Sequence, residues 1–210
     1  MRVLGIPGSL RAGSYNRALL RAARELAPAG MEIVDFDIRE LPFYDGDVEA
    51  AGDPEPVTAF KDAIRSADAV LIATPEYNRG VPGVLKNAID WASRPPLGSP
   101  LSGKPVAIMG ASTGLGGTAR AQEQLRAALE FSRAHVLAQP ELLVPEAYLS
   151  FDADGRLTDD RVRAGIAELL AELARSASGA EPDLADHPLT ASAEEHVEQA
   201  PAPEKAYAPA

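Results

Sequence analysis

The feature that most constrains the fold is a regular alternation of short apolar runs of strand length with longer segments of helical periodicity. The expected strands are 2–7, 31–36, 69–74 and 106–110, followed by a fifth at either 135–138 or 142–144. The expected helices are 16–27, 57–66, 84–92, 118–132 and 159–175. Several strands are apolar on both faces, which is typical of a parallel sheet covered by helices. The sequence therefore predicts an α/β fold, a doubly wound, five-stranded parallel sheet with helices on both faces.

The chain of 210 residues has room for one such domain and a C-terminal extension. We place the domain at 1–175 and the extension at 176–210. The extension contains seven acidic residues and one basic residue, Lys205, and it is rich in Ala, Pro, Glu and Ser. It lacks the apolar periodicity that would give it a face to bury, so we expect a disordered acidic tail.

Charge and cysteine content exclude several functions. Twenty basic against 31 acidic residues give a net charge of -11, which repels nucleic acids and anionic lipid surfaces. No apolar stretch approaches the roughly 20 residues that span a bilayer, and the N-terminus resembles no targeting signal. We therefore expect a cytoplasmic protein that binds neither nucleic acid nor membrane. Because the chain has no cysteine, any redox chemistry must come from a bound organic cofactor.

Three unusual loops follow the first, third and fourth expected strands, at 8–16, 75–83 and 111–118. In doubly wound sheets, ligands bind beyond the carboxyl ends of the strands, where the connections diverge. These three loops are therefore the expected binding site.

The first loop opens the helix expected at 16–27 and suits a phosphate group. A helix N-terminus offers an anion unpaired backbone N–H groups and a favourable dipole. Gly8 and Gly13 allow the backbone to approach a ligand closely. The candidate phosphate donors are Ser9, Arg11, Ser14 and Asn16. Because Ser9 or Ser14 would also serve as an ordinary helix cap, this loop alone does not distinguish phosphate binding from a simple turn.

Two other nucleotide-binding patterns fit this loop less well. In a Walker A loop, which would indicate a phosphotransferase, Gly8 and Gly13 fit but Ser14 stands where the lysine belongs. A dinucleotide fingerprint requires three closely spaced glycines, although Asp35 and Asp37 after the second strand could imitate its ribose-binding acid. We expect those two acids to cap or solvate the strand end instead.

The second loop contains a proline-bounded segment of Glu, Tyr and Asn before a helix. Such a segment can place backbone groups along the polar edge of a flat heterocycle, while Pro75 and Tyr77 shape its apolar side. A flavin ring makes both demands. In the following helix, Trp91 lies off the apolar stripe, which leaves two interpretations, a half-buried core residue or a subunit interface.

The third loop carries Ser112 and several glycines before a helix, which would let the backbone pass close to a cofactor ring. Alone it is only a turn signal. We predict no metal site: Asp152 and Asp154 resemble the start of a calcium loop, but the spacing is one ligand short and the final glutamate is missing. We expect that acidic segment to cap the last helix through Thr158.

Taken together, the loops resemble the NADPH-dependent FMN reductase family of flavodoxin-like proteins, which includes quinone, azo-dye and chromate reductases. The similarity rests on G-S-L-R-x-x-S-x-N in the first loop and on P-E-Y-N-x-x-x-P-G-x-L-K-N-A-x-D-W, which begins at Pro75. The order and spacing match over about residues 1–175, and the extension has no counterpart.

The resemblance implies a flavodoxin-like fold, bound FMN, and NADPH or NADH as electron donor. It implies that Ser9, Arg11, Ser14 and Asn16 surround the FMN phosphate. It implies that Pro75, Glu76, Tyr77 and Asn78 line the edge of the isoalloxazine ring. It implies that Ser112, Gly114, Gly116 and Gly117 close the far side. It also implies a homodimer or homotetramer with the flavin near the interface.

The expected activity is hydride transfer from NAD(P)H through FMN to a small-molecule acceptor such as a quinone, an azo compound, a metal oxyanion or a free flavin. Because the cofactor carries this chemistry, we assign no catalytic side chain. The alternative is a non-enzymatic electron carrier of the flavodoxin type. Such a carrier would bury both ring faces between aromatic residues, whereas only Tyr77 is placed to stack on the ring.

Overall fold

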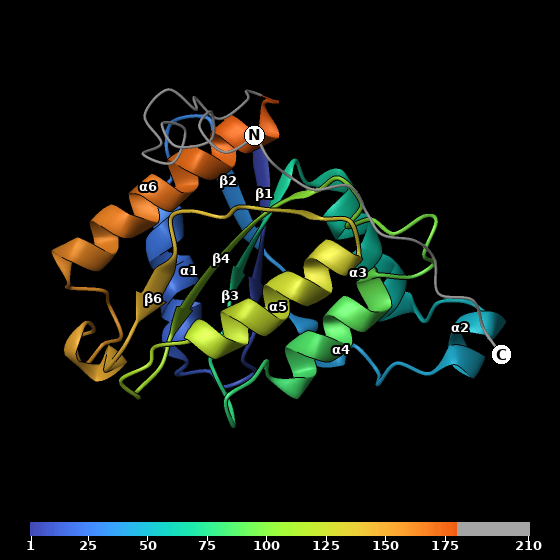
Figure 1. Cartoon of the computed structure of the whole chain (residues 1–210), viewed down its shortest axis with the longest axis horizontal. Helices are drawn as coiled ribbons and strands as arrows, with labels where there is room; N and C mark the ends of the chain where they lie inside the picture. Colours follow the sequence, from blue (N-terminus) through green and yellow to red (C-terminus); the bar gives the residue numbers. More distant parts are fainter. Residues whose placement is uncertain (180–210) are drawn as a thin grey trace, which may run out of the picture. The chain divides into compact units, whose positions relative to one another are not determined.

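The computed structural model describes residues 1–179, so nearly all of the predicted tail lies outside the described residues. The strands are β1 (Arg2–Pro7), β2 (Glu32–Asp35), β3 (Ala69–Ala73), β4 (Pro105–Ala111), β5 (His135–Val136) and β6 (Leu142–Val144). All are parallel, in the order β2-β1-β3-β4-β5, with β6 also paired to β4. This order confirms the predicted flavodoxin-like sheet (Figure 1).

The strand order reverses between β1 and β3, and this reversal positions the site. The chain leaves β1 toward β2 on one side and leaves β3 toward β4 on the other. The loops after β1 and β3 therefore diverge from neighbouring strand ends, and the Gly8 N–H donates to the Ala73 carbonyl across that point at 2.8 Å. This switch point is where doubly wound proteins bind ligands.

The fifth position in the sheet is filled by two short strands in succession. β5 pairs with the beginning of β4, where His135 lies opposite Pro105. β6 pairs with its end, where Leu142 lies opposite Met109. The two segments that the sequence offered as alternatives therefore both pair with β4.

The main helices are α1 (Tyr15–Leu26), α3 (Glu55–Ser66), α4 (Gly83–Ala92), α5 (Ala119–Phe131) and α6 (Asp160–Ala177). Each lies within two residues of its predicted bounds. Two buried clusters show that helices cover both faces: α1 and α6 pack on one face and α3, α4 and α5 on the other (Figure 1).

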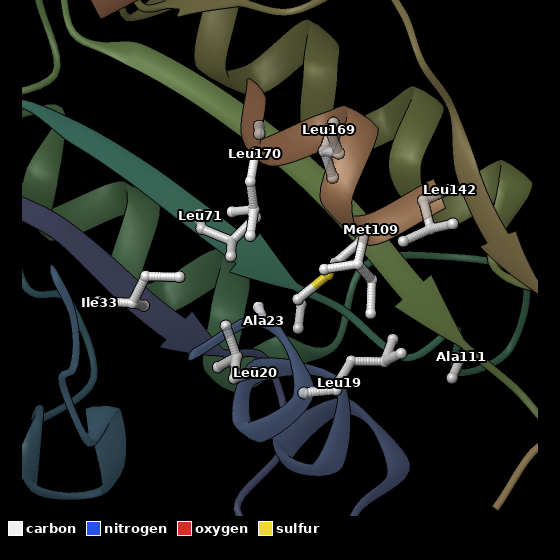
Figure 2. Packing of buried hydrophobic residues seen from close by; sticks show 14 of the residues in the cluster. Leu19, Leu20, Ala23, Ile33, Leu71, Met109, Ala111, Leu142, Leu169 and Leu170 are labelled. Atoms are coloured by element: carbon white, nitrogen blue, oxygen red, sulfur yellow. The ribbon is translucent and has the colours of Figure 1, made fainter. Parts of the chain in front are cut away.

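The first cluster shows why the strands are apolar on both sides. Leu19, Leu20 and Ala23 of α1 and Leu169 and Leu170 of α6 meet the strand side chains on one face (Figure 2). The neighbouring strand residues point to the opposite cluster, because side chains alternate along a strand. Both faces are buried, which fixes the position of the strand ends that carry the loops.

Residues 37–54 contain elements that the sequence did not predict, the 3₁₀ turn η1 (Ile38–Glu40) and the short helix α2 (Gly46–Ala51). This segment covers Trp91, whose indole N–H donates to the Pro42 carbonyl at 2.8 Å. Trp91 is 0% exposed, so the interface interpretation is wrong and it is a core residue. Nearby, the Tyr44 hydroxyl donates to Glu49 at 2.8 Å, and this bond lowers the pKa of the Glu49 carboxyl.

Two further differences concern α6. Its N-cap is Asp159, which accepts from the N–H groups of Arg161 and Val162, so the prediction of a Thr158 cap is wrong by one residue. The helix also includes Ser176 and Ala177, so it extends two residues into the segment predicted to be the tail. Within residues 1–179, no helix has the length and apolarity needed to cross a bilayer.

Candidate functional site

A cavity of about 250 Å³ lies at the carboxyl ends of β1, β3 and β4. It is lined by Ser9, Arg11, Ser14, Tyr15, Asn16, Pro75, Glu76, Tyr77, Ala111, Ser112 and Thr113. All three unusual loops contribute to it, as the doubly wound topology predicts. Residues 9–16, 75–77 and 111–113, which are far apart in the sequence, therefore lie around one concave site.

The first loop supplies a buried, hydrogen-bonded wall. Ser14 is the N-cap of α1, and its hydroxyl accepts from the Asn16 N–H at 3.2 Å. The Asn16 side chain crosses to the end of β4, donating to the Ala111 carbonyl and accepting from the Ala111 N–H, both at 2.9 Å. Ser9, Ser14 and Asn16 are at most 5% exposed. This wall is rigid because each polar group already has a partner within the chain.

The start of α1 adds free donors beside that wall. Among the residues that the structure describes, the backbone N–H groups of Tyr15 and Arg17 form no hydrogen bond. Within the same range, the exposed Arg11 guanidinium has no carboxylate partner. Unpaired N–H groups at a helix N-terminus next to a free guanidinium favour an anion.

The second loop contains a tight hairpin turn with two central residues. Tyr77 and Gly80 exchange backbone hydrogen bonds of 3.1 and 3.0 Å, and Asn78 and Arg79 between them have φ of 52° and 63°. Positive φ at both central residues defines a type I′ turn, which Asn tolerates and Arg adopts at a cost. Gln124 of α5 braces the turn by accepting from the Val81 N–H at 3.2 Å.

Glu76 faces α5. Its carboxylate accepts from the N–H groups of Arg120 and Ala121 at 3.0 and 3.2 Å. The N-cap residue of α5, Thr118, makes no side-chain capping bond, so Glu76 caps this helix from another loop. Its carboxylate therefore anchors the 75–80 segment beside the cavity.

The third loop folds closely over β4. A Cβ on Gly110 would lie 2.1 Å from the Thr118 hydroxyl and 2.4 Å from the Thr74 carbonyl. Only glycine allows this approach of the second and third loops. The Ser112 hydroxyl accepts from the Gly114 N–H at 3.2 Å and shapes the turn that follows.

The structure brings most of the predicted site residues together. Ser9, Arg11, Ser14, Asn16, Pro75, Glu76, Tyr77 and Ser112 all line the cavity. Asn78, Gly114, Gly116 and Gly117 lie in the adjoining loops and are outside its lining. Sequence reasoning missed Tyr15, Ala111 and Thr113, although each directly neighbours a predicted residue.

The two acids at and just after the end of β2 both interact with other residues of the chain. Asp35 pairs with Arg24, and Asp37 caps η1 and pairs with Arg17 at 3.1 Å. This fits the expectation that they cap or solvate the strand end.

The residues fit FMN. The unpaired N–H groups at the start of α1 suit a terminal phosphate, and the half-exposed Tyr77, which lines the same cavity, suits a flat ring. The hydroxyl of Ser9 lies 3.4 Å from that of Tyr77 and links the two ends.

Comparison with known proteins agrees with this geometry. Residues 1–148 match the family model described as NADPH-dependent FMN reductase. The chain is 55% identical over 173 residues to the NAD(P)H-dependent FMN reductase of Pseudomonas aeruginosa, a match covering 82% of this chain and 93% of the relative. It is 46% identical over 159 residues to a quinone reductase of Pseudomonas putida, a match covering 73% of this chain and 83% of that relative.

A solved structure gives the same result. FerB from Paracoccus denitrificans, described as a flavoenzyme NAD(P)H:(acceptor) oxidoreductase, superposes with a TM-score of 0.77 at 36% identity. The match covers 85% of this chain and 97% of FerB.

Proposed function

The chain belongs to the NADPH-dependent FMN reductase family, and we propose that it passes a hydride from NAD(P)H through FMN to a quinone. The family membership makes it an FMN-dependent oxidoreductase with NAD(P)H as donor. The observation that carries the proposal is that one cavity is lined both by the start of α1, with its unpaired backbone N–H groups, and by Pro75, Glu76 and Tyr77.

The phosphate end of this proposal uses Ser9, Arg11 and Ser14. The two hydroxyls can each donate to a phosphate oxygen, and the Arg11 guanidinium supplies a charge. Asn16 lines the same wall, but both ends of its amide bind Ala111. We therefore assign Asn16 a positioning role at the phosphate.

The ring end uses backbone and shape. When bound, FMN supplies the ring that accepts and returns the hydride, so the protein needs no acid, base or nucleophile. Pro75 and Tyr77 shape the apolar side of the ring, and the Glu76 carboxylate holds their backbone through α5. Asn78 would extend the edge of the ring site, and the loop with Ser112, Gly114, Gly116 and Gly117 would close its far side.

The acceptor is a small molecule, and the proposed choice of a quinone is supported by the names of the relatives. Free flavin, azo compounds and metal oxyanions are the further candidates. A homodimer or homotetramer is also proposed; three exposed apolar side chains near the third loop, Leu115, Tyr148 and Leu149, support it. Light scattering after gel filtration tests the oligomer, and cell fractionation tests the expected cytoplasmic location.

The central test is the visible spectrum of the purified protein, before and after incubation with FMN, followed by NADPH oxidation with a quinone. We expect a flavin spectrum and quinone-dependent turnover. Flavin binding with no nucleotide turnover would support the electron carrier instead. A protein that stays colourless in excess FMN would overturn the proposal.

A double variant tests the phosphate assignment. The protein carrying both Ser9→Ala and Arg11→Ala should lose FMN and stay folded. The matched control is Arg65→Ala with Ser66→Ala at the exposed end of α3, which lines no part of the cavity. Full retention of FMN in the first variant would contradict the assignment.

A further inference from the structure

We propose that Arg17, Asp37 and Arg39 form a clamp that positions the first loop for the flavin phosphate from outside the cavity. This inference rests on the proposed function, because it concerns the same phosphate end. None of the three residues lines the cavity. They would therefore act through the loop backbone.

Two guanidinium groups hold two consecutive carbonyls of the loop. Arg17 Nε donates to the Ser9 carbonyl at 3.2 Å, and Arg39 Nη2 donates to the Leu10 carbonyl at 2.7 Å. Arg17 comes from α1 and Arg39 from η1, so the loop is held between two elements. Such bonds to a charged donor are stronger than ordinary backbone hydrogen bonds.

Asp37 joins the two arginines. Its Oδ2 lies 3.1 Å from Arg17 Nη2 and 3.9 Å from Arg39 Nε. Its Oδ1 accepts from the Arg39 backbone N–H at 3.0 Å and caps η1. One carboxylate thus orients both guanidinium groups and the backbone of one of them.

The clamp dictates where the loop N–H groups point. In a trans peptide the C=O and the following N–H point in opposite directions. Holding the carbonyls of Ser9 and Leu10 toward the arginines therefore turns the N–H groups of Leu10 and Arg11 the other way. The Arg11 N–H accordingly points to the Ser9 hydroxyl, at 3.4 Å, and this hydroxyl lines the cavity.

The clamp is expected to affect the conformation of the first loop more than the free energy of unfolding. The exposed fractions of the Arg17, Asp37 and Arg39 side chains are 22%, 49% and 50%, and ion pairs that exposed contribute little to the free energy of unfolding. A loop that is already ordered in the free protein raises the affinity for the ligand, because binding then loses less conformational entropy.

The test uses Asp37→Asn, which retains the Oδ1 cap and removes the charge shared by the arginines. We expect the Kd of the apoprotein for FMN, measured by quenching of flavin fluorescence, to rise about tenfold. The Kd for riboflavin, which lacks the phosphate, should stay within about twofold. The urea midpoint should be nearly unchanged.

The matched control is Asp35→Asn, because Asp35 at the end of β2 forms a comparable ion pair with Arg24 of α1 and makes no hydrogen bond to the loop. Arg39→Ala removes the donor to the Leu10 carbonyl and should also weaken FMN. Arg39→Lys keeps a positively charged donor but loses the planar guanidinium, and it should give an intermediate Kd.

Three results would overturn the clamp: FMN affinity unchanged in both Asp37→Asn and Arg39→Ala, equal weakening for FMN and riboflavin, or an equal loss in Asp35→Asn. Failure of the wild-type protein to bind FMN is a different result, because it rejects the proposed function itself.

Discussion

The two sides of the cavity are built in opposite ways. On the α1 side, Ser9, Ser14 and Asn16 are buried and their side chains are hydrogen-bonded within the chain. On the hairpin side, Tyr77 is 51% exposed and the turn beside it places Asn78 and Arg79 at positive φ. One side is fixed by side chains in the interior, and the other is a strained backbone turn at the surface.

This difference matches two binding tasks. A phosphate is small, charged and the same in every catalytic cycle, so a rigid wall raises affinity by removing the cost of ordering. The donor and acceptor differ from each other and must enter and leave in turn, so an open edge suits them. We therefore expect mutations on the α1 side to change cofactor affinity and those on the hairpin side to change substrate kinetics.

The largest effect is expected at Gly110, where the second and third loops approach each other most closely. Gly110→Ala would place a methyl group within 2.1 Å of the buried Thr118 hydroxyl and 2.4 Å of the Thr74 backbone. Neither Thr118 nor the Thr74 backbone can move away without displacing the loop next to it. We therefore expect a loss of about 3 kcal/mol or more in the free energy of unfolding, and weaker FMN binding. Urea unfolding measures it.

The matched control is Gly116→Ala, where the nearest atom is the flexible end of Arg120 at 3.9 Å. We expect a change of less than about 0.5 kcal/mol there. Equal losses at the two glycines would show that the close approach at Gly110 is unimportant.

The next largest effect tests the rigid side. Asn16→Ala leaves the N–H and the carbonyl of the buried Ala111 without partners, which should cost about 2–3 kcal/mol and weaken FMN binding. In the protein without FMN, Ser14→Ala removes a helix cap and should lower the free energy of unfolding by about 1 kcal/mol. Chemical denaturation gives both values, and a smaller loss for Asn16 than for Ser14 would contradict the bridging role.

A smaller effect tests the anchor of the exposed side. Glu76→Ala removes the cap of α5 and should lower the free energy of unfolding by about 1 kcal/mol, while Glu76→Gln keeps an acceptor and should recover about half. Steady-state kinetics should show a larger KM for the quinone in Glu76→Ala. The FMN Kd should change less than in Asn16→Ala, and a reversal of that order would break the division between the two sides.

The smallest effect tests the strain in the hairpin. Arg79→Gly relieves a left-handed conformation and should raise the free energy of unfolding by about 0.5 kcal/mol, after the added chain entropy of glycine. Asn78→Gly should give a smaller gain in the free energy of unfolding, because Asn already tolerates this conformation. Differential scanning calorimetry checks both, and a loss of stability in Arg79→Gly would show that contacts of the arginine outweigh the strain.

Prediction from sequence succeeded where one local signal dominated. Apolar periodicity located the five main helices within two residues, and loops rich in glycine, serine and proline located most of the cavity lining. It failed at 37–54. The helix α2 in this segment is only six residues long and has no buried residue, so its sequence carries no apolar periodicity. The cover over Trp91 comes from that segment, which explains why its burial could not be predicted.

The sequence by itself determined the layered fold and which three loops carry the site, because strand and helix periods and turn residues are local properties. The tertiary structure decided what the polar residues in those loops do. Asn16 binds Ala111 across 95 positions, Glu76 caps a helix that begins more than 40 residues later, and Asp37 joins arginines from two elements. A hydrogen bond depends on where two groups lie in space, and no local pattern in the chain encodes that distance.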